Sequence, residues 1–143
     1  MSTLTGTPGD DVWYGLIPTA SVDAQAGNDS ATWLSGVGPG SGALMGAGLD
    51  TVQISGIDGV HNMGGVFAGG DDSDSLRNDS DDSVTLEGDA GNDHLYGSAR
   101  SLGDRLIGEP VTTSTRSRAW AARSSRPTGR PAATTPFRST PRP

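Results

Sequence analysis

The hydrophobic residues of this chain occur mostly as single positions between runs of glycine and aspartate. An apolar residue repeatedly follows an aspartate by two positions, at the centre of triplets such as VWY, TVQ, SVT, HLY and RLI. No useful length of chain shows the 3.6-residue apolar period of an amphipathic helix. The triplets predict strands of two or three residues bounded by Gly/Asp turns, and almost no helix in residues 1–109.

The same pattern predicts which side chains form the core. They are Trp13, Val22, Ala31, Val52, Leu76, Val84, Leu95 and Leu106. So few modest side chains do not offset the entropy of ordering about a hundred residues. The 22 glycines make the cost larger, because glycine loses the most freedom on folding. The sequence therefore predicts an additional stabiliser, and a chain without cysteine has no disulfide to serve as one.

The glycines and aspartates follow a nine-residue frame. Residues 88–97, GDAGNDHLYG, match the pattern G-G-x-G-x-D-x-U-x, where U is a large apolar residue, with Asp89 at the second glycine. Weaker copies occupy residues 6–14, 24–32, 46–52 and 69–77. Residues 33–45 are Gly-rich and out of register, which predicts a loop. That segment lacks the Gly-Lys-Ser/Thr of a phosphate-binding loop.

This pattern resembles the calcium-binding nonapeptide of the repeats-in-toxin (RTX, haemolysin-type) family. The resemblance implies an all-β, right-handed parallel β-roll of short strands and Gly/Asp turns, with Ca²⁺ between adjacent turns. Calcium accepts six to eight oxygen ligands, and glycine-rich turns can aim carbonyl oxygens inward. Carried over to this chain, the resemblance implies a metal site built from Gly6, Gly9, Asp11, Gly27, Asp29, Gly48, Asp50, Gly69, Gly70, Asp74, Gly88, Gly91 and Asp93.

Asp11 and Asp29 are the best candidates for a stacked pair, because they lie eighteen residues, or two repeats, apart. Asp82 and Asp104 match the pattern only at the step from aspartate to apolar residue, and they are not assigned to the site. If the resemblance holds, binding of calcium neutralises the clustered carboxylates and orders the turns in one event.

Charge divides the chain into a repeat region, residues 1–108, and a tail, residues 109–143. All 17 acidic residues lie at or before Glu109, whereas residues 110–143 contain seven arginines and no acid. The tail composition predicts a disordered Arg/Pro/Ser/Thr segment. Codons for Gly-Gly-Ala-Gly-Asn-Asp-Ile-Asp, with one base deleted, encode Gly108 to Thr115. We therefore interpret the tail as a frameshifted continuation of the repeats.

The predicted function is calcium binding that drives folding, not catalysis. His61 and His94 belong to no metal-ligand or catalytic spacing, and His94 falls at a solvent-facing repeat position. Proteins resembling this family are secreted by a type I exporter that reads a C-terminal signal, so we expect an extracellular parent; a frameshift would remove that signal here. No apolar run is long enough to span a membrane.

Two alternatives remain open. The repeats could be a structural or adhesive segment of a larger secreted enzyme or toxin, with an extracellular or cell-surface partner of unknown identity. The arginine-rich tail could instead bind polyanions, without specificity for a nucleic-acid sequence.

Overall fold

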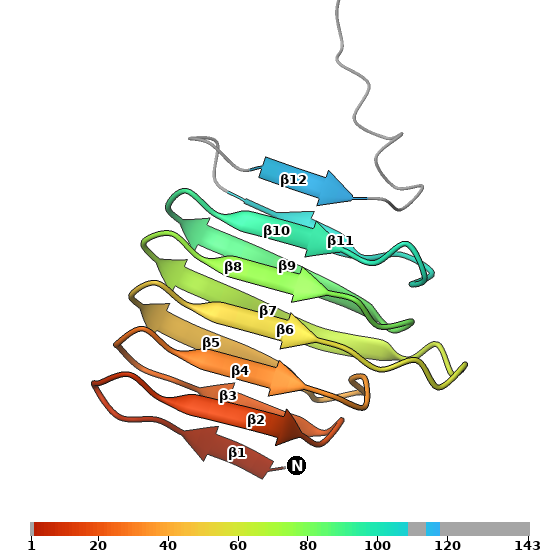
Figure 1. The fold of residues 1–143 in the computed structure, drawn as a ribbon, viewed down its shortest axis with the longest axis horizontal. Coiled ribbons are helices and arrows are strands. Elements are labelled where there is room, and N and C mark those ends of the chain that lie inside the picture. The colour runs from red at the N-terminus through yellow and green to blue at the C-terminus, as the bar shows by residue number, and fades with distance from the viewer. Residues whose placement is uncertain (1, 109–113, 118–143) are drawn as a thin grey trace, which may run out of the picture.

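The chain winds into a parallel β-solenoid in which each coil adds one strand to each of two facing sheets (Figure 1). The computed structural model describes residues 2–108 and 114–117, the latter for the backbone alone. The odd-numbered strands form one six-stranded sheet and the even-numbered strands form the other, both in sequence order. Neighbouring strands are parallel throughout. The predicted all-β parallel solenoid is confirmed.

The odd-strand sheet consists of β1 (Ser2–Thr5), β3 (Ala20–Asp23), β5 (Gly42–Ala47), β7 (Met63–Asp71), β9 (Ser83–Ala90) and β11 (Arg105–Ile107). The even-strand sheet consists of β2 (Val12–Leu16), β4 (Ser30–Trp33), β6 (Thr51–Ile54), β8 (Ser75–Asn78), β10 (His94–Gly97) and β12 (Ser114–Ser117). Several strands are longer than the two or three residues expected from the sequence, and β7 reaches nine.

The two edges of the solenoid differ in how regular their turns are. The turns that lead from an odd to an even strand lie at the left of Figure 1, and we call this side the ladder edge. The turns at the opposite edge include two long loops, residues 34–41 and 55–62. Because of these loops, equivalent residues on successive coils lie 18, 21, 24 and 19 residues apart. Insertions in turns therefore explain why the nine-residue frame drifts.

Alternating side chains of both sheets fill the space between the sheets. Strand pairing places Val22, Ala43, Phe67 and Leu86 in register along the odd-strand sheet. The even-strand sheet contributes Ala31, Val52, Leu76 and Leu95 in the same way. The eight core positions expected from the sequence all belong to this core, with Trp13 and Leu106 partly buried at its margin.

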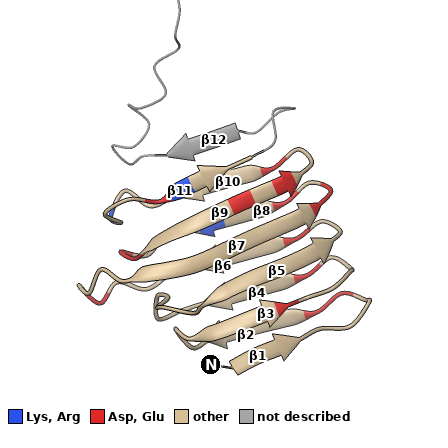
Figure 2. Ribbon diagram, turned by 180° about the vertical axis from the view of Figure 1, so that it is seen from behind, with Lys and Arg blue, Asp and Glu red and all other residues tan. Residues whose placement is uncertain are grey.

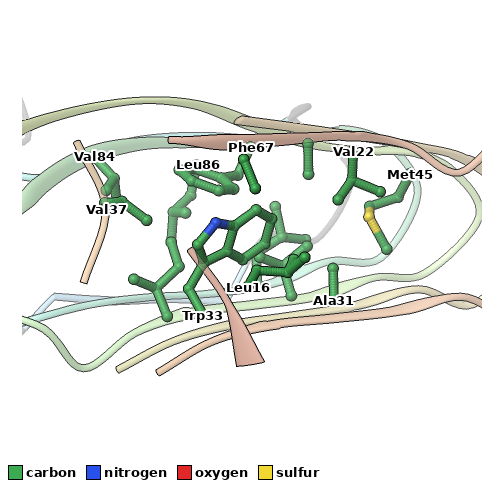
Figure 3. Packing of buried hydrophobic residues seen from close by; sticks show 14 of the residues in the cluster. Leu16, Val22, Ala31, Trp33, Val37, Met45, Phe67, Val84 and Leu86 are labelled. Carbon is green, nitrogen blue, oxygen red and sulfur yellow. The ribbon is translucent and has the colours of Figure 1, made fainter. Parts of the chain in front are cut away.

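The expectation that residues 33–45 form a loop is wrong at both ends of that segment. Trp33 is the last residue of β4, and residues 42–45 open β5. The Trp33 side chain is fully buried and meets Phe67 edge to face, with ring centroids 5.0 Å apart (Figure 3). Val37 and Met45 are also fully buried. The nine-residue frame missed these residues because they enter the core from inserted stretches.

The described residues contain strands, turns and bends but no helix, as the sequence predicted. It follows that residues 2–108 and 114–117 provide no helix of the length and apolarity needed to cross a membrane. The expected disorder of the tail concerns residues 109–143, which lie almost entirely outside the described residues.

Candidate functional site: an aspartate ladder

Five aspartates stack on one another along the ladder edge, one from each successive coil, and we call them the aspartate ladder. They are Asp11, Asp29, Asp50, Asp74 and Asp93. Each stands directly before an even-numbered strand. Figure 2 shows acidic segments at successive turns of this edge, which lies to the right in that view. The structure thus brings together all five aspartates proposed from the sequence.

Backbone hydrogen bonds connect the rungs of the ladder. The amide N–H of Asp11 donates to Oδ1 of Asp29 over 2.7 Å, and the amide of Asp29 donates to Oδ1 of Asp50 over 2.7 Å. The pattern continues from Asp50 to Asp74 at 2.8 Å and from Asp74 to Asp93 at 3.0 Å. The carboxylates of Asp29, Asp50, Asp74 and Asp93 therefore each cap the coil that precedes them, and the structure places Asp29 against the backbone of Asp11 on the adjacent coil.

The second carboxylate oxygen of four rungs is buried without a hydrogen-bond partner. These atoms are Oδ2 of Asp29, Asp50, Asp74 and Asp93. The four residues are at most 2% exposed. Asp11 differs, because its Oδ2 accepts from the amide and the hydroxyl of Thr7 at 2.6 and 3.0 Å. A buried acceptor without a donor is costly, so four of them in one row are a feature of the ladder that needs a physical explanation.

The pKa values of three ladder aspartates are raised above their ordinary value. The pKa of Asp74 is raised to about 7, chiefly by burial and also by the charges of Asp50 and Asp93, against the lowering effect of the amide of Asp50. Burial likewise raises the pKa of Asp29 and of Asp50, with repulsion from adjacent carboxylates as a further cause. Among residues 2–108 the only ion pair joins Arg77 to Asp79, away from the ladder edge. The ladder thus concentrates negative charge without a protein cation.

Glycine at the first repeat position leaves room for the aspartate five residues later. A Cβ at Gly69 would overlap the carboxylate of Asp74, and a Cβ at Gly88 would overlap that of Asp93. Gly6 stands in the same relation to Asp11. These glycines, chosen from the motif alone, therefore shape the pocket around the carboxylate.

Residues at the second and fourth repeat positions adopt the left-handed backbone conformation, with positive φ, that the turn requires. Among the described residues, the non-glycine residues with positive φ are Gln25 (81°), Asp72 (78°) and Asp89 (58°), and each replaces a glycine of the motif. The degenerate copies therefore keep the turn conformation despite the changed residue. Added side-chain atoms at Gly48 and Gly91 would strike the carbonyl oxygens of Gly27 and Asp72 one coil earlier. These carbonyl oxygens thus lie directly against the turn glycines of the next coil.

A second row, which the sequence analysis missed, runs beside the ladder at the fifth repeat position. Oδ1 of Asp10 accepts from the amide of Asn28 at 2.8 Å, and Oδ1 of Asn28 accepts from the amide of Leu49 at 2.9 Å. The hydroxyl of Ser73 accepts from the amide of Asn92 at 3.3 Å. Residues at this position cap the following coil, whereas the ladder aspartates cap the preceding one. The recurrent Asn-Asp pair, at residues 28–29 and 92–93, was the sequence signal that could have revealed this second row.

Asp82 and Asp104, which the motif left unassigned, do not join the ladder. They precede the odd-numbered strands β9 and β11, so they lie at the opposite edge. Sequence spacing alone does not reveal this, because Asp74, Asp82, Asp93 and Asp104 are about equally spaced but alternate between the edges.

The donor set of the ladder fits a hard cation that takes oxygen ligands. The described residues contain no group of three or more His, Cys, Asp or Glu that could hold a metal ion by themselves. Unpartnered carboxylate oxygens of two neighbouring rungs are nevertheless available in each gap from Asp29 to Asp93, and the adjacent turns carry backbone carbonyl oxygens. Calcium accepts this mixture of carboxylate and carbonyl oxygens. His94 is exposed and His61 contacts the carbonyl of Asp81, so neither belongs to the ladder.

The fold and the ladder together define a parallel β-solenoid protein with a row of buried aspartates along one edge. No family model, curated protein or solved structure matches this chain. The interpretation of the ladder therefore depends on the chemistry of its own residues.

Proposed function

We propose that the protein binds calcium ions along the aspartate ladder and that this binding stabilises the solenoid. The observation that carries the proposal is the row of four buried, unpartnered Oδ2 atoms on Asp29, Asp50, Asp74 and Asp93. A divalent cation supplies positive charge that compensates these oxygens and the repulsion between rungs.

The residues that would hold the ions are the carboxylates of successive rungs, together with carbonyl oxygens of the intervening turns. Oδ1 of Asp29, Asp50, Asp74 and Asp93 is already used by an amide of the preceding coil, so Oδ2 is the oxygen left for an ion on these four rungs. Glycine at the first repeat position of two copies keeps that oxygen accessible at Asp74 and Asp93. Calcium is favoured over magnesium because it tolerates irregular coordination and sheds its water more readily.

Binding to this site couples to folding, because the ladder exists only when coils 18 to 24 residues apart are stacked. An ion that binds the folded chain and not the unfolded one stabilises the fold by mass action. The structural role and the binding role are then one property of the same residues.

The supporting experiment is a calcium titration of the full chain in a chelated buffer. We expect uptake of calcium in calorimetry and a parallel gain of β-type circular dichroism, with magnesium failing to substitute. Sodium chloride at matched ionic strength controls for general screening of the acidic charge. Absence of both calcium uptake and spectral change up to about 10 mM, above the range of weak extracellular modules, would contradict the proposal.

We also propose that the chain is a degenerate RTX-type segment of a secreted protein, without catalytic activity of its own. What supports this is the match of residues 88–97 to the nonapeptide and the left-handed turns retained in the worn copies. Affinity for calcium in the range of about 0.1–1 mM, typical of extracellular modules, is the measurable consequence. Submicromolar affinity would instead point to an intracellular site.

A further inference from the structure

The two edges of the solenoid treat buried aspartates in opposite ways. At the opposite edge, Oδ2 of Asp82 accepts from the amide of Val37 at 2.8 Å, and its Oδ1 accepts from the amide and the side-chain nitrogen of Asn62 at 2.8 and 3.0 Å. Asp82 is 1% exposed, as deeply buried as the ladder rungs. Both of its oxygens therefore accept hydrogen bonds from N–H donors of the protein.

Asp104 repeats this arrangement on the next coil. Its Oδ1 accepts from the amide of Val84 at 3.1 Å and from the side chain of Asn78 at 3.0 Å, and its Oδ2 accepts from the amide of Ser98 at 2.6 Å. N–H donors compensate a buried carboxylate but cannot ligate a metal ion, and they occupy the lone pairs that an ion would need. The buried carboxylates of Asp82 and Asp104 are thus compensated by hydrogen-bond donors of the protein itself.

The local sequence does not show which buried aspartates receive N–H donors on both oxygens and which do not. Asp82 and Asp104 stand two residues before a buried or half-buried apolar side chain, as the ladder aspartates do. The difference is that loops 34–41 and 55–62 supply amides to Asp82, whereas the short turns of the ladder edge supply one amide per rung.

We propose that calcium binds only along the ladder edge, in the three gaps between Asp29, Asp50, Asp74 and Asp93, and that the opposite edge is a metal-independent latch. This inference rests on the proposed function. The latch joins three coils through Asp82 alone, because Val37 and Asn62 belong to different loops. Asp11 is excluded because its Oδ2 is occupied by Thr7, so the protein then binds at most three ions on its described coils.

Asp81 is the one residue of the opposite edge that tests this limit. Its Oδ1 is buried without a partner, while its Oδ2 accepts from the amide of Gly59 at 2.8 Å. The other buried carboxylates of this edge, those of Asp82 and Asp104, have both oxygens occupied, so no second buried carboxylate oxygen is left free beside Asp81. Asp81 is therefore expected to remain without an ion.

The first test locates the ions in the unsubstituted full chain. Gadolinium(III) is titrated in place of calcium, and broadening of assigned backbone amide signals is measured by NMR. We expect early loss of the signals of Asp29, Asp50 and Asp74, while those of Val37, Asn62 and Gly59 stay sharp at the same gadolinium level. Early broadening of the second group would overturn the inference and leave calcium binding intact.

The second test counts ions with two matched variants. Asp93→Asn and Asp104→Asn alter buried aspartates eleven residues apart on opposite edges. Native mass spectrometry in calcium is expected to show one ion fewer for Asp93→Asn and an unchanged number for Asp104→Asn. Loss of an ion from folded Asp104→Asn, or more than three ions on the wild type, would contradict one-edge binding. Complete absence of calcium from the wild type would refute the proposed function itself.

Discussion

Replacing Asp74 by asparagine should stabilise the metal-free protein and weaken the calcium-loaded one. Asparagine has the same shape and keeps an oxygen for the amide of Asp50, but it removes the charge that burial and the neighbouring rungs disfavour. The pKa of Asp74 rises from an ordinary 3.8 to about 7, and each pH unit of such a rise is worth about 1.4 kcal/mol, which bounds the cost of the charge at about 4 kcal/mol.

Two corrections reduce this bound. Solvent near the edge screens the interaction, which leaves about 2 kcal/mol. The new amide N–H groups are themselves buried without acceptors, which costs about 1 kcal/mol more. We therefore expect Asp74→Asn to gain about 1 kcal/mol in chelator at pH 8. In calcium the sign reverses, because the variant has lost a charged ligand.

The pH dependence of stability tests whether the charge of Asp74 destabilises the metal-free protein. A raised pKa means that the folded metal-free protein holds a proton on Asp74 between about pH 4 and 7 that the unfolded chain has released. Its stability therefore falls as pH rises through that window and levels off above it. The advantage of Asp74→Asn should be absent near pH 4 and complete above pH 7.

The assay is urea denaturation of both proteins in chelator and in calcium, at pH 4 and pH 8, with a stabilising osmolyte added equally where the metal-free chain is unfolded. Asp104→Asn is the control: it turns an N–H donor toward the amides that now bind Asp104, so it should destabilise the protein with and without calcium. Equal destabilisation of Asp74→Asn in both buffers would refute this account of the ladder.

Three further predictions follow from the packing and the reading frame. Gly88→Ala should cost about 1–3 kcal/mol in urea denaturation because its Cβ overlaps the Asp93 carboxylate, whereas Gly103→Ala, with open space around it, should be nearly neutral; equal effects would contradict the clash. Trp33→Ala should cost about 3–5 kcal/mol by the same assay, and a loss below about 1 kcal/mol would disprove its central place in the core. Sequencing of the coding DNA from Gly108 onward should reveal Gly-Gly-Ala-Gly-Asn-Asp in the shifted frame. That frame places an aspartate at position 113, twenty residues beyond Asp93 and directly before the strand partner of His94. A shifted frame without Gly/Asp repeats would exclude the frameshift.

The repeat pattern, through its resemblance to the RTX nonapeptide, was enough to predict the solenoid and the five aspartates of the ladder. Aspartate followed after one residue by a buried apolar side chain, as at Asp93 and Leu95, defines a turn that leads into a short strand. Glycine next to these turns is required by backbone angles and by the bulk of the carboxylate, both of which act within a few residues. These constraints act within nine consecutive residues, so the five rungs and their glycines could be identified from the sequence.

Which edge each aspartate occupies was decided only by the tertiary structure. Inserted loops change the length of each coil, so Asp82 lies at the edge opposite Asp74 and takes its donors from Val37, 45 residues away. The same long-range pairing places Trp33 and Met45 in the core, although their segment carries no repeat signal. A hydrogen bond between coils depends on the register of strands far apart in the chain, and no local pattern encodes that register once the repeat length varies.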